Sequence, residues 1–402
     1  MIELQGKFNT AKVFTDNADD VTISQVIGML NEEFTAGSNI RIMPDTHAGA
    51  GSVIGTTMTI KDKVVPNLVG VDIGCGMATL TLGKIDIDFK ELDSYIRANV
   101  PHGFNVHDEE KQFPLLEELK CKARIDMNRA LRSIGTLGGG NHFIEVGVDS
   151  NDNKYLVIHS GSRYLGLQVA KYYQELAFNK LSDNAEDKEA LIQKLKAEGR
   201  EKDIQRELKK IKPKKVNKDL AYLEGQDLMN YLHDMDIAQK YAILNRAEIV
   251  GSILKHLKRE GMGNIGFNAT HNYFNTIHNY IDIGDMMLRK GAISAKAGER
   301  VLIPINMRDG SILARGKGNP DWNYSAPHGA GRLFSRGKAK ETFKLEEFKM
   351  TMEEASIYTT SVSESTLDEC PMAYKPMTEI IENTKDTIEI IDIIRPLYNF
   401  KA

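Results

Sequence analysis

The segment VVPNLVGVDIGCGMATLTL, residues 64–82, is the most informative part of the sequence for the fold. It is apolar and rich in β-branched residues, and glycines interrupt it. This pattern predicts two short buried strands around a tight turn at 70–76. Strand patterns recur at the end of GTLGGGNHFIEVGV (135–148), in NKYLVIHSGSR (153–163) and in the C-terminal tail, TIEIIDIIRPLYNFKA. Short strands joined by glycine turns should therefore form the centre of the fold.

Helices are predicted between and around these strands, and their order excludes two common architectures. Strands and helices do not alternate regularly, so neither a TIM barrel nor a doubly wound sheet is supported. We predict a mixed α/β (α+β) fold, in which one compact domain over residues 1–402 has irregular central β layers and flanking helices. The expected helical regions are 22–34, 112–133, 165–260, 345–356 and 374–384.

The middle of the longest helical region, AEDKEALIQKLKAEGREKDIQRELKKIKPKKVNKD (185–219), is highly charged. We interpret residues 180–220 as a charged helical insertion within the domain, in the form of a solvated helical hairpin. An arm that contacts RNA is the alternative, because lysines cluster near its end. These lysines are Lys209, Lys210, Lys212, Lys214, Lys215 and Lys218.

The composition of the chain excludes several classes of protein. The 402 residues are 41% hydrophobic and 27% charged, which is enough apolar material for a core without disulfide or zinc support. Only three cysteines are present, so a disulfide framework is excluded and a reducing, cytoplasmic location is expected. Neither a signal peptide nor a run of about 18 apolar residues is visible, so no membrane partner is expected. A net charge of −4 excludes a general basic coat for nucleic acid, but not a local basic groove.

Five glycine-rich segments carry side chains that could do chemistry. Glycine lets the backbone approach a ligand closely, and Asp, Cys and His are typical ligands of transition metals. Each segment alone is a weak signal, and the sequence has no P-loop, GxSxG or HExxH motif. The order of the five segments along the chain is more informative about function than any one of them. The segments are Asp72-Ile73-Gly74-Cys75-Gly76, Gly140-Asn141-His142, Ile158-His159-Ser160-Gly161-Ser162-Arg163, Thr270-His271-Asn272-Tyr273 and His328-Gly329-Ala330-Gly331-Arg332.

Together these segments resemble the RtcB family of GTP-dependent RNA ligases. The resemblance covers nearly the whole chain except the charged segment around 180–220. It implies an enzyme that joins RNA 3′-phosphate or 2′,3′-cyclic phosphate ends to 5′-hydroxyl ends in RNA repair or tRNA splicing. GTP, two Mn²⁺ ions and a histidine–GMP intermediate are implied, and an accessory activating protein is a conceivable partner. The matching motifs are MPDTHAGAGSVIG, VGVDIGCGM, GTLGGGNHFIEV, VIHSGSR, HNY, RKGAISAKAGE, RGKGN, HGAGRLFSR, DECPMAYK and Lys401.

The resemblance also implies roles for individual residues. Cys75 would bridge two metal ions. Asp72 and His142 would complete one metal site, and His159 and His271 the other. His328 would be the nucleophile that accepts GMP. Positions implied to hold the guanylate are Asn141, Phe143, Glu145, Asn272, Pro304, Asn306, Met307, Ser311, Gly329, Ala330, Gly331, Tyr374 and Lys401. Two other histidines are weaker candidates: His47 as a residue that lines the cleft, and His278 as an outer partner of the metal site, on a helix shared with His271.

Departures from the family pattern keep other functions open. Pro304-Ile305-Asn306-Met307 stands where Pro-Gly-Ser-Met is usual, and Ser-Ala-Pro precedes His328 where Cys-Ser is common. A dinuclear-metal phosphodiesterase that acts on RNA ends without guanylylation is one alternative, and a non-catalytic RNA-binding relic is another. The soft thiolate of Cys75 would favour zinc by affinity, so manganese rests on the resemblance alone.

Overall fold

Two β-sheets form the body of the protein in the computed structural model, which describes residues 1–211, 214–259 and 272–402. The six-stranded sheet has the order β1 (Ile2–Gln5), β2 (Thr10–Val13), β3 (Ile40–His47), β4 (Ile54–Thr59), β12 (Met287–Lys290) and β11 (Asn279–Asp282). Two smaller pairs are β13 (Ala292–Ser294) with β16 (Ser325–Pro327) and β5 (Lys63–Val64) with β9 (Leu223–Glu224).

The eight-stranded sheet carries most of the candidate site. Its order is β10 (Tyr273–Ile277), β6 (Gly76–Gly83), β8 (Lys154–Ser160), β7 (Phe143–Val148), β18 (Ile388–Lys401), β15 (Gly310–Gly316) and β14 (Arg300–Asn306), with β17 (Tyr358–Thr359) beside β18. The predicted strand in the C-terminal tail is thus confirmed as β18. It lies between β7 and β15, and its register places Lys401 opposite Phe143.

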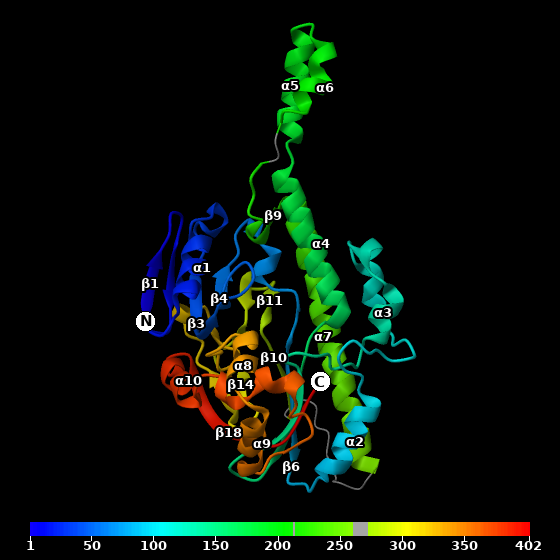
Figure 1. Cartoon of the computed structure of the whole chain (residues 1–402), viewed down its shortest axis with the longest axis vertical. Helices are drawn as coiled ribbons and strands as arrows, with labels where there is room; N and C mark the ends of the chain where they lie inside the picture. Colours follow the sequence, from blue (N-terminus) through cyan, green and yellow to red (C-terminus); the bar gives the residue numbers. More distant parts are fainter. Residues whose placement is uncertain (212–213, 260–271) are drawn as a thin grey trace.

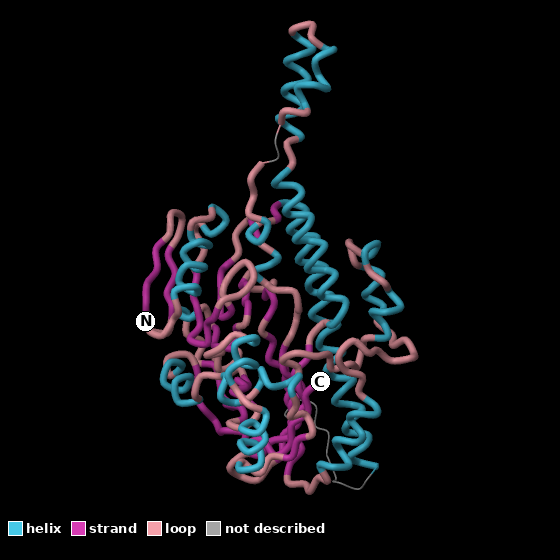
Figure 2. Tube along the Cα trace, in the orientation of Figure 1, coloured by secondary structure: helices cyan, strands magenta, loops and turns pink. Residues whose placement is uncertain are grey.

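Helices flank these sheets, and the long helices α4 and α7 run along one side of the body (Figure 2). Aspartates begin several of them: Asp19 Oδ1 accepts the Thr22 N–H at 2.6 Å at the start of α1. The helices are α1 (Asp20–Leu30), α2 (Phe89–Asn99), α3 (Met127–Arg132), α4 (Arg163–Ser182), α5 (Ala185–Ala197), α6 (Ile204–Leu208), α7 (Gly225–Arg259), α8 (Arg336–Thr342), α9 (Leu345–Glu354) and α10 (Met377–Thr384). Among the helices that the structure describes, none has the length and apolar composition that a membrane span requires.

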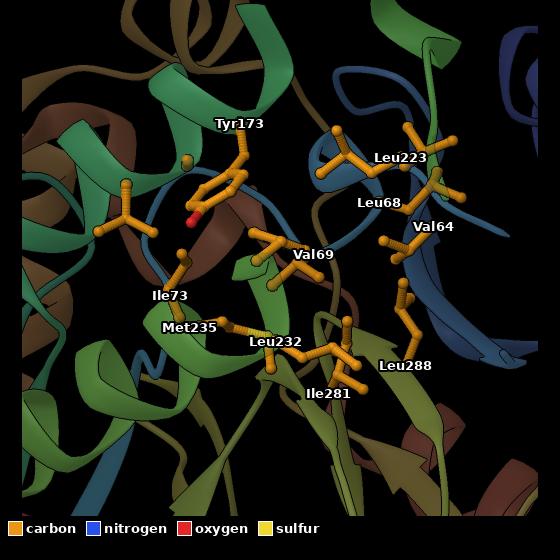
Figure 3. Packing of buried hydrophobic residues seen from close by; sticks show 14 of the residues in the cluster. Val64, Leu68, Val69, Ile73, Tyr173, Leu223, Leu232, Met235, Ile281 and Leu288 are labelled. Carbon is orange, nitrogen blue, oxygen red and sulfur yellow. The ribbon is translucent and has the colours of Figure 1, made fainter. Parts of the chain in front are cut away.

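The segment 64–73 lies at the centre of the largest hydrophobic cluster. Val64, Leu68, Val69 and Ile73 pack between α4 and α7 on one side and β11 and β12 on the other, as Figure 3 shows. Burying these side chains fixes the chain just before Cys75. The predicted mixed α/β fold is confirmed, and its core therefore holds one of the candidate ligands in place.

Two local predictions were wrong. The first strand predicted in 64–82 is only Lys63–Val64, because Pro66 starts a 3₁₀ turn at Pro66–Leu68. The helix predicted over 112–133 is mostly two 3₁₀ turns, Pro114–Glu118 and Lys122–Arg124, with α3 as its last part. Asp126 ends that irregular stretch by capping α3, since its side chain accepts the Arg129 N–H at 3.0 Å.

The charged segment extends beyond the body. Helices α5 and α6 continue outward from the end of α4 and form a projecting arm (Figure 1). Its short helices carry ion pairs between near neighbours, such as Arg200 with Asp203 at 2.9 Å. The division of the chain into one domain with this insertion stays a prediction.

Candidate metal and nucleotide site

Three adjacent strands bring together a buried cluster of one thiol and two imidazoles. Cys75 immediately precedes β6, His142 precedes β7 and His159 lies on β8. Cys75 Sγ lies 3.5 Å from His142 Nε2 and 3.3 Å from His159 Nε2. The three ligand atoms all lie within 4.8 Å of one another. This is the spacing that a metal ion bound by three side chains needs.

Asp72 completes one side of this cluster. Its Oδ2 lies 3.0 Å from His142 Nε2, and its Oδ1 accepts the Ser162 N–H at 3.1 Å. A Cβ on Gly161 would stand 2.1 Å from Asp72 Oδ1, so only glycine leaves room for the carboxylate at that position. Burial opposes ionisation of Asp72, but the contact with His142 and the nearby Arg163 and His159 together outweigh it and lower the pKa of the carboxyl.

The tautomers of both histidines suit a metal. His142 Nδ1 donates to the Leu137 carbonyl at 2.8 Å, and His159 Nδ1 donates to the Asn141 carbonyl at 3.1 Å. Because a carbonyl can only accept, each Nε2 keeps its lone pair. Both Nε2 atoms lie near Cys75 Sγ, and that of His142 also lies near Asp72 Oδ2. Burial and nearby histidines lower the pKa of His159 well below its usual value, so the ring is neutral, as a ligand must be.

The Cys75 thiol also fits a cation. Burial, followed by the charge of Asp72, raises its pKa well above the usual value. A thiolate at this position therefore requires a compensating positive charge, and a bound divalent ion supplies one. The donor set of carboxylate, thiolate and two imidazoles thus fits a transition-metal site.

His278 joins the cluster, whereas His271 lies outside the described residues. The His278 N–H donates to the Cys75 carbonyl at 2.9 Å, and its Nε2 lies 3.4 Å from His159 Nε2. Its ring is buried, and Nδ1 has no hydrogen-bond partner in the described parts of the chain. The helix on which His278 was expected is instead strand β10 followed by β11. The His278 ring therefore lies directly against His159, one of the candidate ligands.

His328 lies next to this cluster and is held by a buried carboxylate. His328 Nδ1 donates to Asp45 Oδ2 at 2.7 Å, and the same oxygen accepts the backbone N–H groups of His328 and Gly329 at 3.1 and 3.2 Å. Asp45 is fully buried at the end of β3. This arrangement leaves His328 Nε2 free, and the His328 ring centroid lies 4.8 Å from that of His278.

One pocket gathers His328 and most of the predicted guanylate positions. Of the thirteen, eleven line it, and His47 lines it as well. Asn272 and Ser311 do not: the Asn272 carbonyl accepts the Thr81 N–H beside β6, and Ser311 is buried within β15. The predicted positions that line the pocket are Asn141, Phe143, Glu145, Pro304, Asn306, Met307, Gly329, Ala330, Gly331, Tyr374 and Lys401.

Two buried carboxylates give this pocket its polarity. Glu145 Oε1 has no partner in the described residues, and burial raises the pKa of Glu145 to about 8 despite the charge of Lys401. Glu369 pairs with Lys401 and accepts the Tyr374 hydroxyl at 2.7 Å. Burial opposes its ionisation, but Lys401 and Arg336 outweigh it and hold the pKa of Glu369 at about 2. Glu369 thus has hydrogen-bond donors within the protein, whereas Glu145 Oε1 is left for a donor from a bound ligand.

Comparison with known proteins agrees with this arrangement. A family model described as "tRNA-splicing ligase RtcB" matches residues 34–125 and 115–402. The chain belongs to the RtcB family. It is 31% identical to RNA-splicing ligase RtcB1 of Escherichia coli strain ATCC 25922 and to RNA-splicing ligase RtcB of E. coli K12, with 90% of each chain covered. It is 26% identical to the tRNA-splicing ligase RtcB of Nanoarchaeum equitans, over 90% of this chain and 87% of that protein.

The loop that departs from the RtcB pattern has its own internal structure. Asn306 Oδ1 accepts the N–H groups of Arg308 and Asp309, both at 2.9 Å, and its amide donates to Asp309 Oδ2 at 2.8 Å. The Asn306 side chain is therefore engaged in the β14–β15 turn, whereas the resemblance implies that it holds the guanylate. Ile305 is buried but still lines the pocket.

The sequence did not lead us to Asp45 or Glu369 as site residues. It also did not predict that His278 contacts the cluster directly. Asp45 and Glu369 lie inside the RtcB-like motifs MPDTHAG and DECPMAYK, so a signal was present. The triplet His-Asn-Tyr occurs twice, at 271–273 and 278–280, and the first copy was chosen. The second copy is the one that lies at the cluster in the described structure.

Proposed function

We propose that this protein is an RNA ligase that joins a 3′-phosphate or 2′,3′-cyclic phosphate end to a 5′-hydroxyl end, in RNA repair or tRNA splicing. The observation that carries the proposal is the position of His328. Its free Nε2 faces a pocket with an unpartnered buried carboxylate and lies beside a cluster able to hold metal. The names of the relatives, which are RNA-splicing and tRNA-splicing ligases, agree with this activity.

In the first step, His328 Nε2 attacks the α-phosphorus of GTP. A nitrogen–phosphorus bond forms, the bond to the pyrophosphate breaks, and pyrophosphate leaves. Asp45 acts as a positioning residue, because it holds the Nδ1–H and keeps the lone pair on Nε2. Such a covalent intermediate divides one difficult phosphoryl transfer into two easier ones.

In the second step, the 3′-phosphate oxygen of RNA takes GMP from His328, and the histidine is regenerated. The 5′-hydroxyl of the other strand then attacks the activated 3′-phosphate, forms the phosphodiester and releases GMP. A 2′,3′-cyclic phosphate must first be opened by water to give the 3′-phosphate.

We assign the metal ligands to two groups that share Cys75. Asp72 and His142 serve the first site, and His159 with His278 the second, while His271 remains the alternative from sequence. Two divalent cations, Mn²⁺ by resemblance, would supply Lewis acidity that polarises the phosphates and neutralises developing charge.

Guanylate recognition follows from the pocket chemistry. Glu145, as a carboxylate, would accept N–H groups from the guanine edge, which satisfies an oxygen that is otherwise buried without a partner. Adenine lacks the paired N–H groups of guanine at this edge, so GTP should be preferred over ATP.

A dinuclear-metal phosphodiesterase is the second candidate. The altered loop favours it, because Asn306 is engaged in its own turn and Ile305 replaces a flexible glycine. Such an enzyme would use the metals and RNA ends without any covalent change at His328.

A sealing assay separates the two candidates. One RNA strand ends in a 3′-phosphate and the other begins with a 5′-hydroxyl, and both are incubated with Mn²⁺ and either GTP, ATP or no nucleotide. The ligase forms the joined product with GTP only. Cleavage or dephosphorylation of the ends without joining, with equal rates in all three conditions, would favour the phosphodiesterase.

Lys401→Ala is expected to reduce GMP-adduct formation about tenfold or more at limiting GTP, a loss of about 1.4 kcal/mol or more of binding free energy. The reason is that Lys401 is the buried cation that holds Glu369 at the wall of the pocket. The measurement is the rate of adduct formation as GTP is varied. Arg332 remains 3.3 Å from Glu369, so the melting temperature should fall by only a few degrees.

Deletion of Ala402 alone is the control for Lys401→Ala, because it changes the same end of the chain and keeps both the strand and the cation. It should leave the adduct rate unchanged. Equal adduct rates in Lys401→Ala and wild type would remove Lys401 from the nucleotide site.

A further inference from the structure

A second pocket opens beside the nucleotide pocket. The glycine-rich loop before β7, which contains Gly139 and Gly140, lies between them. We call the second pocket the Phe104 pocket. Its wall includes Phe104, Arg129, Thr136, Gly140, Arg163 and Tyr164. Gly140 lines this pocket, and the next residue, Asn141, lines the pocket of His328. A ligand in the Phe104 pocket would therefore lie one residue away from the candidate reaction site.

Phe104 is the most exposed large hydrophobic side chain in the described chain, with 94% of its surface accessible. The backbone around it is nevertheless fixed. The Gly103 N–H donates to the Gly138 carbonyl at 2.9 Å, and His102 forms an isolated β-bridge with Gly138. An aromatic ring is thus held in solvent at the edge of a pocket, where a planar partner could cover it.

The pocket is also cationic. Arg129 stacks its guanidinium 4.9 Å from the centroid of the Tyr164 ring, and no carboxylate side chain lines the pocket. Arg163 has a left-handed backbone with φ of 54°, an unusual conformation for arginine that its side-chain bonds hold in place. Its Nε donates to Thr136 Oγ1 and its Nη2 to the Gly103 carbonyl, each at 3.2 Å.

These features match one class of ligand. A single-stranded nucleotide offers a flat base and a negative phosphate, and proteins bind it with aromatic faces and arginines. An uncharged peptide or lipid would leave the two arginines without a counterpart, and a lone anion would leave the exposed ring without one. Since the wall reaches the glycine loop, the nucleotide would belong to a strand that continues into the reaction site.

We propose that the Phe104 pocket binds the nucleotide at or next to the reacting end of an RNA strand, with the base stacked on Phe104 and its phosphate near Arg129 and Arg163. This inference rests on the proposed ligase function for its substrate. The strand is either the one that ends in a 3′-phosphate or the one that begins with a 5′-hydroxyl, and the experiments below distinguish them.

Phe104→Ala is expected to lower kcat/KM for sealing by about tenfold, the loss typical of one base–aromatic stack, and to leave the GMP adduct rate unchanged. Phe104→Tyr should restore sealing, because it keeps the ring. Phe8→Ala is the matched control, since Phe8 is also exposed but does not line the pocket. Sealing by Phe104→Ala at the wild-type rate with subsaturating RNA would overturn the proposal.

A binding measurement tests the pocket without catalysis. Trp322 is the only tryptophan in the sequence and is buried against Phe14, so Phe104→Trp adds a distinct fluorescent reporter. Oligonucleotides with a 3′-phosphate and with a 5′-hydroxyl are titrated separately, without GTP. Quenching by either strand supports the proposal, and the stronger effect identifies the strand.

Lack of quenching by both strands would overturn the proposal. Failure of the ligase function itself would look different: wild type would then form neither adduct nor joined RNA, whatever the fluorescence of Phe104→Trp shows.

Discussion

His328→Ala is expected to abolish the covalent GMP adduct and to reduce joining of 3′-phosphate and 5′-hydroxyl ends by at least about a thousandfold. The variant removes the only atom proposed to attack GTP. The fold and the metal cluster should survive, because His328 is partly exposed and the proposed ligands come from other strands. Adduct formation is read after denaturing electrophoresis with labelled GTP. His233→Ala is the control, since His233 is a partly exposed histidine on α7 that does not line the pocket.

A pre-activated RNA gives this prediction a sharper form. If the 3′-phosphate already carries GMP, the nucleophile is no longer needed, and His328→Ala should join the strands at a measurable rate. The metal cluster remains available to this variant. If His328→Ala and Cys75→Ala fail equally on this substrate, then His328 is not simply the acceptor of GMP.

Cys75→Ala is expected to reduce adduct formation by about a hundredfold or more, beyond the roughly 10–100-fold that loss of an outer partner of a metal ligand costs. The Cys75 thiol lies near both His142 and His159, so its loss removes the proposed shared ligand. The measurement is the metal content of the purified protein after exchange into Mn²⁺. Retention of two metal ions per chain would contradict the assignment.

Cys121→Ala is the matched control for Cys75→Ala. Cys121 is an equally buried thiol, but its neighbour is Asp234, whose carboxylate accepts its backbone N–H at 2.9 Å. This variant should keep both the metal content and the adduct. A similar loss in both variants would point to general destabilisation of the core.

Local patterns in the sequence were enough to predict most of the strands that carry the site. The apolar run in 388–400 predicted β18, and the glycine-rich loop that leads into FIEVGV predicted β7. Pairing partners were not predictable, because Cys75, His142 and His159 meet only through the order of strands β6, β8 and β7 in the sheet. The irregular segment 112–133 was read as helix because its charges and apolar residues suit one, whereas Pro114 and the cap at Asp126 divide it.

Some of the candidate site residues were identifiable from local motifs, whereas others required the three-dimensional structure. Asp72, Cys75, His142 and His159 were chosen from their motifs, and the structure brings them together. His278 was judged secondary because a helical spacing from His271 was assumed. Strands β10 and β11 flank His278 instead, and its Nε2 lies 3.4 Å from His159 Nε2. The motif around Asp45 marked that segment, but its role needed the three-dimensional contact with a histidine 283 positions away.

The most direct test of the account is the mass of the intact protein after incubation with GTP and Mn²⁺, followed by peptide mapping. The account predicts the addition of one guanylyl group per chain, on His328, and its disappearance when RNA with a 3′-phosphate is added. A protein that binds metal but gains no guanylyl group, or carries it on another residue, would contradict the proposed role of His328.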